Sequence, residues 1–223
     1  MFRKVLAGAM ILAGLLIVGC GGADKVVGSP DKAILAYSEL VTMGESPNMA
    51  AAGFSDEDNK NLRKMMVKVF EASFNGIVPL SDKSAEDLAN VFYDSSKAKI
   101  KFQATLKTDD AERPVVELTT TPFNMSNNAA AFAPNDELIA LIGMVGKLKS
   151  DGATDEQLKS NPEVQKLAIE VFGKYLKELP LQPEMTCAVV CKKVTGTDGN
   201  THWAPEDVNA LMDFITLGKL ADK

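Results

Sequence analysis

Residues 98–107 read AKIKFQATLK, and their side chains alternate between apolar and polar. Ile100, Phe102, Ala104 and Leu106 fall on one side of an extended chain, and lysine, glutamine and threonine fall on the other. Because successive side chains of a strand point to opposite faces, this pattern predicts a strand with one face on a core and one in water. Antiparallel sheets commonly have that arrangement. The stretch therefore predicts an antiparallel sheet that is covered on one side.

Three further strands are expected, each bounded by turn residues: 115–121, 185–195 and 200–203. The last two are separated by Asp198-Gly199, a pair that is favoured in two-residue hairpin turns. The four strands thus form two hairpins. One lies in the middle of the chain and the other near its end.

Helices are predicted where apolar residues recur every three or four positions behind a capping residue. The expected helices span about 29–43, 55–75, 84–92, 135–150, 161–179 and 205–217. Ser29-Pro30 shows the usual start, with serine as the cap and proline at the first helical position. Helices combined with antiparallel hairpins predict an α+β domain over residues 29–223, with a helical insertion around 135–179.

The start of the chain has the parts of a secretory signal. Arg3 and Lys4 form a short basic segment, Val5–Val18 is uncharged, and small residues follow. The apolar run is shorter than the roughly 20 residues that a membrane-spanning helix needs. Residues 1–19 are therefore expected to be a signal peptide.

The signal ends in Ile17-Val18-Gly19-Cys20, which resembles the bacterial lipobox. In proteins with a lipobox the cysteine thiol receives a diacylglyceryl group, and cleavage before the cysteine makes it the first residue. The resemblance implies that Cys20 carries lipid, palmitate included, and that 20–28 is a tether. It also implies a location on the cell membrane or outer membrane, facing outside the cytoplasm. Two or more acyl chains anchor stably. The alternative is a secreted protein cut near Ala23.

The order of the expected elements resembles the cystatin-like or nuclear-transport-factor-2-like α+β roll that is found in many bacterial lipoproteins. The matching features are the lipobox, the helix at Ser29-Pro30, the paired hairpins and the ending His202–Asp207, HWAPED. In that fold a curved sheet wraps a helix and leaves a cone-shaped cavity. Some members use the cavity for ligands, and others fill it with side chains. The resemblance implies a fold and not an activity.

Composition limits the partners. The chain has a formal net charge of −6, and its lysines are scattered. Nucleic-acid binding needs clustered positive charge, so no nucleic-acid partner is expected. A polybasic segment that would add electrostatic membrane binding is also missing from the sequence. We therefore expect membrane attachment through the lipid on Cys20 alone.

Two cysteines besides Cys20 lie in one predicted strand. Cys187 and Cys191 flank Ala188-Val189-Val190, and residues four apart on a strand lie about 13 Å apart. A disulfide needs Cα atoms within roughly 7 Å of each other, so we expect two buried free thiols. A zinc site usually combines two short Cys/His motifs, and the sequence has no second one.

No catalytic residue, metal site or cofactor is predicted. The single histidine, His202, is expected on a sheet face or at a strand end rather than as an acid–base group. Asp56-Glu57-Asp58-Asn59 is similar to a calcium loop but lacks its glycine and its final glutamate, and it is interpreted as a helix start. Gly146-Lys147 lacks the spacing of a phosphate loop and is interpreted as helix interior.

Three functional classes stay open. The first is a non-catalytic, membrane-tethered binding or scaffolding module that contacts an envelope protein, a peptide or a small ligand. The second is an enzyme or small-ligand carrier that uses the cavity of the α+β roll. The third is a surface lipoprotein without a discrete ligand. The scarcity of histidine and the missing motifs disfavour the enzyme, and nothing in the sequence separates the first class from the third.

Overall fold

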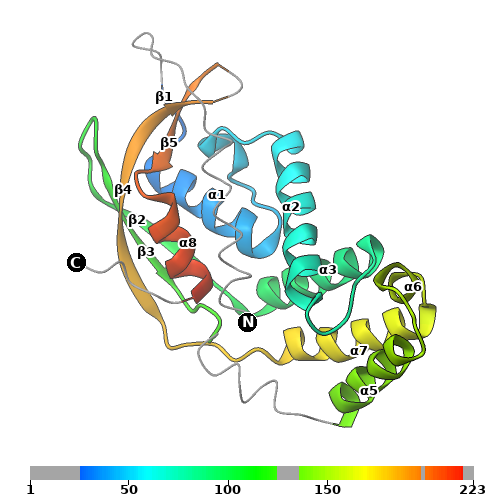
Figure 1. Ribbon diagram of the computed structural model, residues 1–223. Coiled ribbons are helices and arrows are strands. Elements are labelled where there is room, and N and C mark those ends of the chain that lie inside the picture. The colour runs from blue at the N-terminus through cyan, green and yellow to red at the C-terminus, as the bar shows by residue number, and fades with distance from the viewer. Residues whose placement is uncertain (1–25, 125–135, 197–198, 218–223) are drawn as a thin grey trace.

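A computed structural model describes residues 26–124, 136–196 and 199–217. In these ranges, seven α-helices pack on one curled five-stranded sheet (Figure 1). The strand order is β1-β5-β4-β3-β2, and only the β1–β5 pair is parallel. The strands are β1 (Val26–Val27), β2 (Phe102–Thr108), β3 (Val115–Thr120), β4 (Met185–Thr195) and β5 (Thr201–Pro205). The predicted α+β class, with helices on a curved antiparallel sheet, is confirmed.

The helices form two groups around two apolar clusters. The α-helices are α1 (Pro30–Met43), α2 (Asp56–Phe74), α3 (Asp82–Lys99), α5 (Asp136–Ser150), α6 (Asp155–Lys159), α7 (Pro162–Glu178) and α8 (Val208–Leu217), and the 3₁₀ helix η3 spans Met49–Ala52. Helices α1 and α8 share one cluster with the sheet, whereas α2, α3, α5 and α7 build the other. The predicted helical insertion is confirmed, because α5, α6 and α7 lie between β3 and β4 in the chain.

Helix α1 is enclosed by the sheet and its neighbouring helices. Ala33, Ile34, Ala36, Tyr37 and Leu40 each expose at most 1% of their surface. Fully burying a side chain of the size of leucine or isoleucine contributes about 1.5–3 kcal/mol, so this helix is a main source of stability. The curl of the sheet is consequently filled by side chains.

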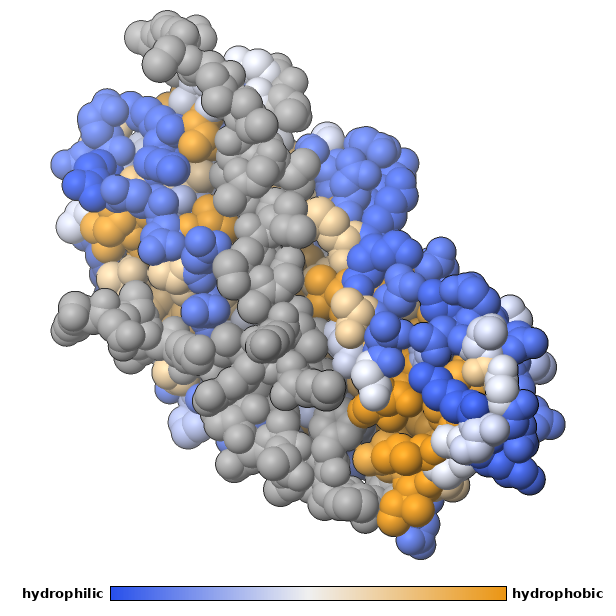
Figure 2. All heavy atoms as spheres, in the orientation of Figure 1, coloured by the Kyte–Doolittle hydropathy of each residue, from blue (hydrophilic) through white to orange (hydrophobic). Residues whose placement is uncertain are grey.

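Aromatic side chains join the helices of the second cluster. Phe74 of α2 stacks on Phe172 of α7, with ring centroids 4.0 Å apart. The outer face of α5 leaves Ile139 and Ile142 about half exposed, at 54% and 51%. Figure 2 shows apolar side chains gathered at the lower right of the molecule, where α5 lies in Figure 1.

The strand predicted at 98–107 begins later, at Phe102. Residues up to Lys99 belong to α3, which begins at Asp82. The helix predicted at 84–92 is therefore too short at both ends. Two serines near the end of α3 have hydrogen-bond partners within the helical layer. Ser96 Oγ donates to the carbonyl of Phe92, and Ser95 Oγ donates to the carbonyl of Leu176 on α7. Because both hydroxyl groups have partners within the protein, both serines can be buried in a helix.

Two further boundaries differ from the prediction. The last helix starts at Val208 and not at Pro205, because Pro205 still pairs with Cys191 as part of β5. The short helix α6 was not predicted. Thr154 and Gln157 form a capping box at its start, and this local signal is present in the sequence.

The first described residues are part of the sheet. Val26 and Val27 pair in parallel with Thr201 and His202 of β5. They fall within the segment expected to be a tether, 20–28, whereas Cys20 itself and the predicted signal peptide lie outside the described residues. In the ranges that the structure describes, no helix has both the length and the apolar character to cross a bilayer.

Candidate functional site

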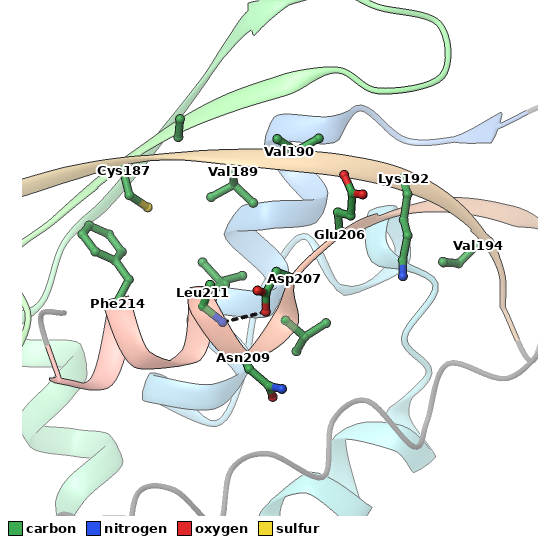
Figure 3. Close-up of a pocket in the computed structure, with 13 residues that line it drawn as sticks. Cys187, Val189, Val190, Lys192, Val194, Glu206, Asp207, Asn209, Leu211 and Phe214 are labelled. Carbon is green, nitrogen blue, oxygen red and sulfur yellow. Dashed lines mark hydrogen bonds between the residues drawn. The ribbon is translucent and has the colours of Figure 1, made fainter. Parts of the chain in front are cut away.

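The groove between β4 and α8 is the main candidate for a ligand site (Figure 3). It has a volume of about 700 Å³. Cys187 and Val189 project from β4 toward Phe214 and Leu211 of α8, and these four side chains give the groove its apolar walls. Exposed polar side chains line the rest of it: Lys192, Glu206, Asp207 and Asn209. An apolar groove with a polar rim suits a ligand that is itself partly apolar.

The groove exists because the chain leaves the sheet directly after β5. The Glu206 amide still donates to the carbonyl of Val190, at 2.8 Å, as a last rung of the β4–β5 ladder. The Asp207 carboxylate then accepts from the Ala210 amide at 2.9 Å and caps α8. Since β5 does not continue, the described residues place a strand on only one side of the first half of β4, namely β3.

One of the charged groups at the rim of the groove takes part in an ion pair. Glu206 pairs with Arg113 at 2.6 Å, and the pair is exposed to solvent. The hydrogen bond that Arg113 donates to Glu206 raises the pKa of Arg113, which keeps this guanidinium charged. Among the residues that the structure describes, no three His, Cys, Asp or Glu side chains are grouped as a metal ion would need.

The two thiols differ in exposure. Both are free, as predicted, but only Cys191 is fully buried, whereas Cys187 is half-buried. The expectation of two buried thiols is therefore wrong for Cys187, because its side chain borders the groove. Burial raises the pKa of each thiol to about 12. The nucleophilic thiolate is thus scarce at neutral pH.

His202 lies on β5, as expected from its position beside Trp203, and it is buried away from the groove. Its ring packs on Gly53, which has a positive φ of 76°. A Cβ at that glycine would come within 2.6 Å of the His202 Cδ2 atom. The close approach explains why this turn needs glycine.

The two remaining motif candidates have structural roles. The segment that is similar to a calcium loop forms the start of α2, where Ser55 and Asp58 make a capping box. Gly146 and Lys147 lie inside α5, as expected. Cys20, the one residue to which the sequence assigned chemistry, lies outside the described residues.

A second hollow, of about 490 Å³, lies between α2 and α3. Several of its cationic groups are already engaged. Arg63 donates to the Gly44 carbonyl at 3.2 Å and to Asn90 Oδ1 at 2.7 Å, and it lies over the ring of Tyr93. Lys68 bridges Glu71 and Asp82 at 2.9 and 3.0 Å. These contacts point to a structural role for the hollow.

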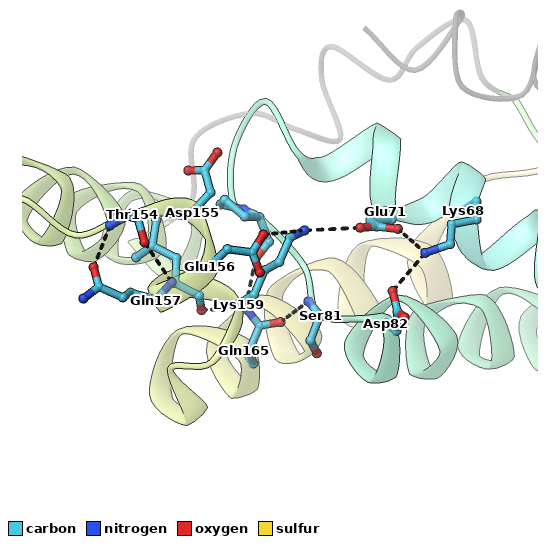
Figure 4. Close-up of polar contacts among 12 residues, drawn as sticks. Lys68, Glu71, Ser81, Asp82, Thr154, Asp155, Glu156, Gln157, Lys159 and Gln165 are labelled. Atoms are coloured by element: carbon cyan, nitrogen blue, oxygen red, sulfur yellow. Dashed lines mark hydrogen bonds and ion pairs between the residues drawn. The ribbon is translucent and has the colours of Figure 1, made fainter.

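The polar network beside this hollow joins α2, α3, α6 and α7 (Figure 4). Its buried centre is Gln165 of α7. The side-chain oxygen accepts from the Ser81 amide at 2.9 Å, and the side-chain nitrogen donates to the carbonyls of Pro79 and Leu158 at 2.9 and 3.0 Å. One side chain thus bonds two backbone groups of the distant loop between α2 and α3 and one backbone group of α6.

No protein-family model matches the chain, and no curated protein matches it. Its structure is similar to the crystal structure of a "putative lipoprotein (ycdA)" from Bacillus subtilis subsp. subtilis str. 168, with a TM-score of 0.53 and 18% sequence identity. The match covers 85% of this chain and 56% of that protein. The chain therefore matches little more than half the length of the Bacillus protein, and the similarity supports the fold alone.

Replacing Gln165 with leucine should lower the free energy of unfolding by about 2–4 kcal/mol, because the Ser81 amide and the Pro79 carbonyl lose their side-chain partner. The exposed network member Lys68 offers a control, since Lys68→Met should cost about 1 kcal/mol or less. Urea denaturation followed by circular dichroism measures both. A Gln165→Leu variant as stable as the control would contradict this role.

Both internal thiols should resist alkylation in the folded protein. With a pKa of about 12, each has about a thousandfold less thiolate at pH 8 than a free cysteine, whose pKa is about 8.5. Because the folded-state pKa values are raised, the stability they contribute is present below about pH 8.5 and is lost as the pH rises further. Intact-mass analysis after N-ethylmaleimide treatment of a Cys20→Ala variant measures the labelling. Equal rates with and without urea would disprove the burial.

Proposed function

We propose that this protein is a lipid-anchored module of the cell envelope that binds a ligand without catalysing a reaction on it. The lipobox at Ile17–Cys20 supports the anchor, with a signal peptide over 1–19 and lipid on Cys20. The Bacillus subtilis protein of similar fold is itself described as a "putative lipoprotein". The module faces outside the cytoplasm, on the cell membrane or outer membrane.

The groove between β4 and α8 is the observation that carries the binding function. The curl of the sheet is filled by α1 and α8, so the available space lies beside the sheet. We assign residues 29–223 to one cystatin-like or nuclear-transport-factor-2-like roll, and the packing of α1 inside the curl supports that assignment. In this roll the proposed ligand site lies between β4 and α8, beside the curl of the sheet, and not at its centre.

The chemistry of the groove supports binding rather than catalysis. Its thiol, Cys187, stays protonated at neutral pH because burial raises its pKa to about 12. The buried His202 is not among the residues that line the groove. A protonated thiol and apolar walls make contacts with a ligand but supply no activated nucleophile. The two carboxylates at the rim are already engaged, Glu206 with Arg113 and Asp207 as the cap of α8.

The anchor is tested by replacing Cys20 with alanine. The variant should leave the membrane fraction or retain an uncut signal peptide, because the thioether to the lipid can no longer form. Fractionation and intact-mass analysis distinguish these results from the lipidated protein. Normal processing together with unchanged membrane attachment would refute the proposed anchor.

The groove is tested with the apolar fluorophore 1-anilinonaphthalene-8-sulfonate. Replacing Cys187 with phenylalanine fills the space between β4 and α8 and should weaken fluorophore binding at least fivefold in a fluorescence titration. Thr186→Phe is the matched control, because it adds the same ring on the exposed face of β4. Equal binding by the wild-type protein and the Cys187→Phe variant, or no binding by either, would count against the groove. Circular dichroism verifies that both variants fold.

A further inference from the structure

We propose that the groove takes an extended polypeptide segment, which adds as a strand to the free edge of β4 at Thr186–Val190. This inference rests on the proposed binding function and names its ligand class. The partner is a segment of another protein or a peptide with alternating apolar and polar residues.

The direction of the backbone groups of β4 follows from the register. The Cys191 amide donates to the Pro114 carbonyl, at 2.9 Å, on the β3 side of the strand. In an antiparallel ladder, alternate residues point their N–H and C=O groups to the same side. Cys187 and Val189 therefore also bond toward β3, with Leu118 and Val116 as their pairs.

The residues between them point the opposite way. Thr186, Ala188 and Val190 direct their N–H and C=O groups away from β3, and the bond from the Glu206 amide to the Val190 carbonyl confirms this direction. At Thr186 and Ala188 none of the described residues supplies a hydrogen-bond partner on this side. Both residues are exposed. Two N–H and two C=O groups are thus open to an added strand.

The open positions lie where β5 would continue if it were longer. Its ladder with β4 runs from Thr195 to Cys191, followed by the single bond at Val190. The chain then turns into α8 at Val208. Unpaired edges of this kind pair readily with an extended chain. An added strand would extend the ladder along the same side of β4.

The walls of the groove determine which side chains the segment needs. Alternate side chains of the added strand would face the side on which Cys187, Val189, Leu211 and Phe214 lie. The others would face outward beside Thr186 and Ala188. At about 3.3 Å per residue, the edge from Thr186 to Val190 takes a segment of about five residues. Apolar residues at every second position therefore fit best.

The test uses a fluorescein-labelled peptide of sequence Lys-Thr-Val-Thr-Val-Thr-Lys and the full chain. Replacing Ala188 with proline removes an N–H group that β3 does not use, and proline is tolerated where that group faces away from the ladder. Each hydrogen bond contributes about a two- to tenfold gain in affinity. Fluorescence anisotropy should show binding to the wild-type protein and about a two- to tenfold loss of affinity for Ala188→Pro. Ala188→Val keeps the N–H group and should bind as the wild type does.

N-methylated peptides make the test independent of protein folding. In antiparallel pairing only every second peptide amide faces β4. Methylating one alternate set should abolish binding, and methylating the other set should leave it within about threefold of the parent peptide. Equal effects of the two sets, no effect of Ala188→Pro, or no peptide binding up to millimolar concentration would each overturn strand addition.

The two proposals fail separately. If the fluorophore binds the groove and Cys187→Phe displaces it, but the peptide results are negative, the groove is a ligand site and strand addition is wrong. If neither the fluorophore nor the peptide binds, the proposed binding function fails as well. Amide hydrogen exchange provides a further readout, since the Thr186 and Ala188 amides should become protected only when the peptide is bound.

Discussion

The architecture depends on the way in which β4 is shared between two ladders. Met185–Val190 pairs with β3 on one side, and Cys191–Thr195 pairs with β5 on the other. A strand that changes partners along its length brings the two hairpins together as one curled sheet. The side chains of Val189 and Cys191 on its inner face then reach the cluster that contains α1 and α8. Because β5 pairs only with Cys191–Thr195, the other half of β4, Met185–Val190, has an open edge on that side.

Local periodicity was sufficient to predict most elements. The strands that contain Phe102–Leu106 and Met185–Thr195 can be recognised from the residues within each segment alone, and both are present in the structure. The error at residues 98–101 has a physical cause. The alternating pattern extends toward the N-terminus as far as Ile100. Ile100 is buried, but it directly follows helix α3 and is not part of a strand. Burial was inferred correctly there, but the secondary structure that provides it was not.

The candidate site could not be predicted in the same way. Val189, Leu211 and Phe214 all fit an ordinary core pattern, and the groove among them depends on β5 ending at Pro205 while β4 continues. Relative strand lengths and register are tertiary properties. The sequence does contain one useful signal, because Asp207 is a good helix cap immediately behind the strand. The network of Gln165 is a similar case, since its three partners are backbone groups that no side-chain pattern reveals.

The parallel pairing of β1 with β5 has a consequence for orientation at the membrane. Five residues lie between Cys20, the proposed site of the lipid, and Val26, and the six fully extended steps from Cys20 to Val26 reach about 20 Å. If Cys20 carries the proposed lipid, the β1–β5 edge of the domain would be held within that distance of the bilayer surface. Figure 1 shows α5 at the opposite end of the molecule from β1. The half-exposed Ile139 and Ile142 of α5 would then lie at the end of the domain away from the attachment point.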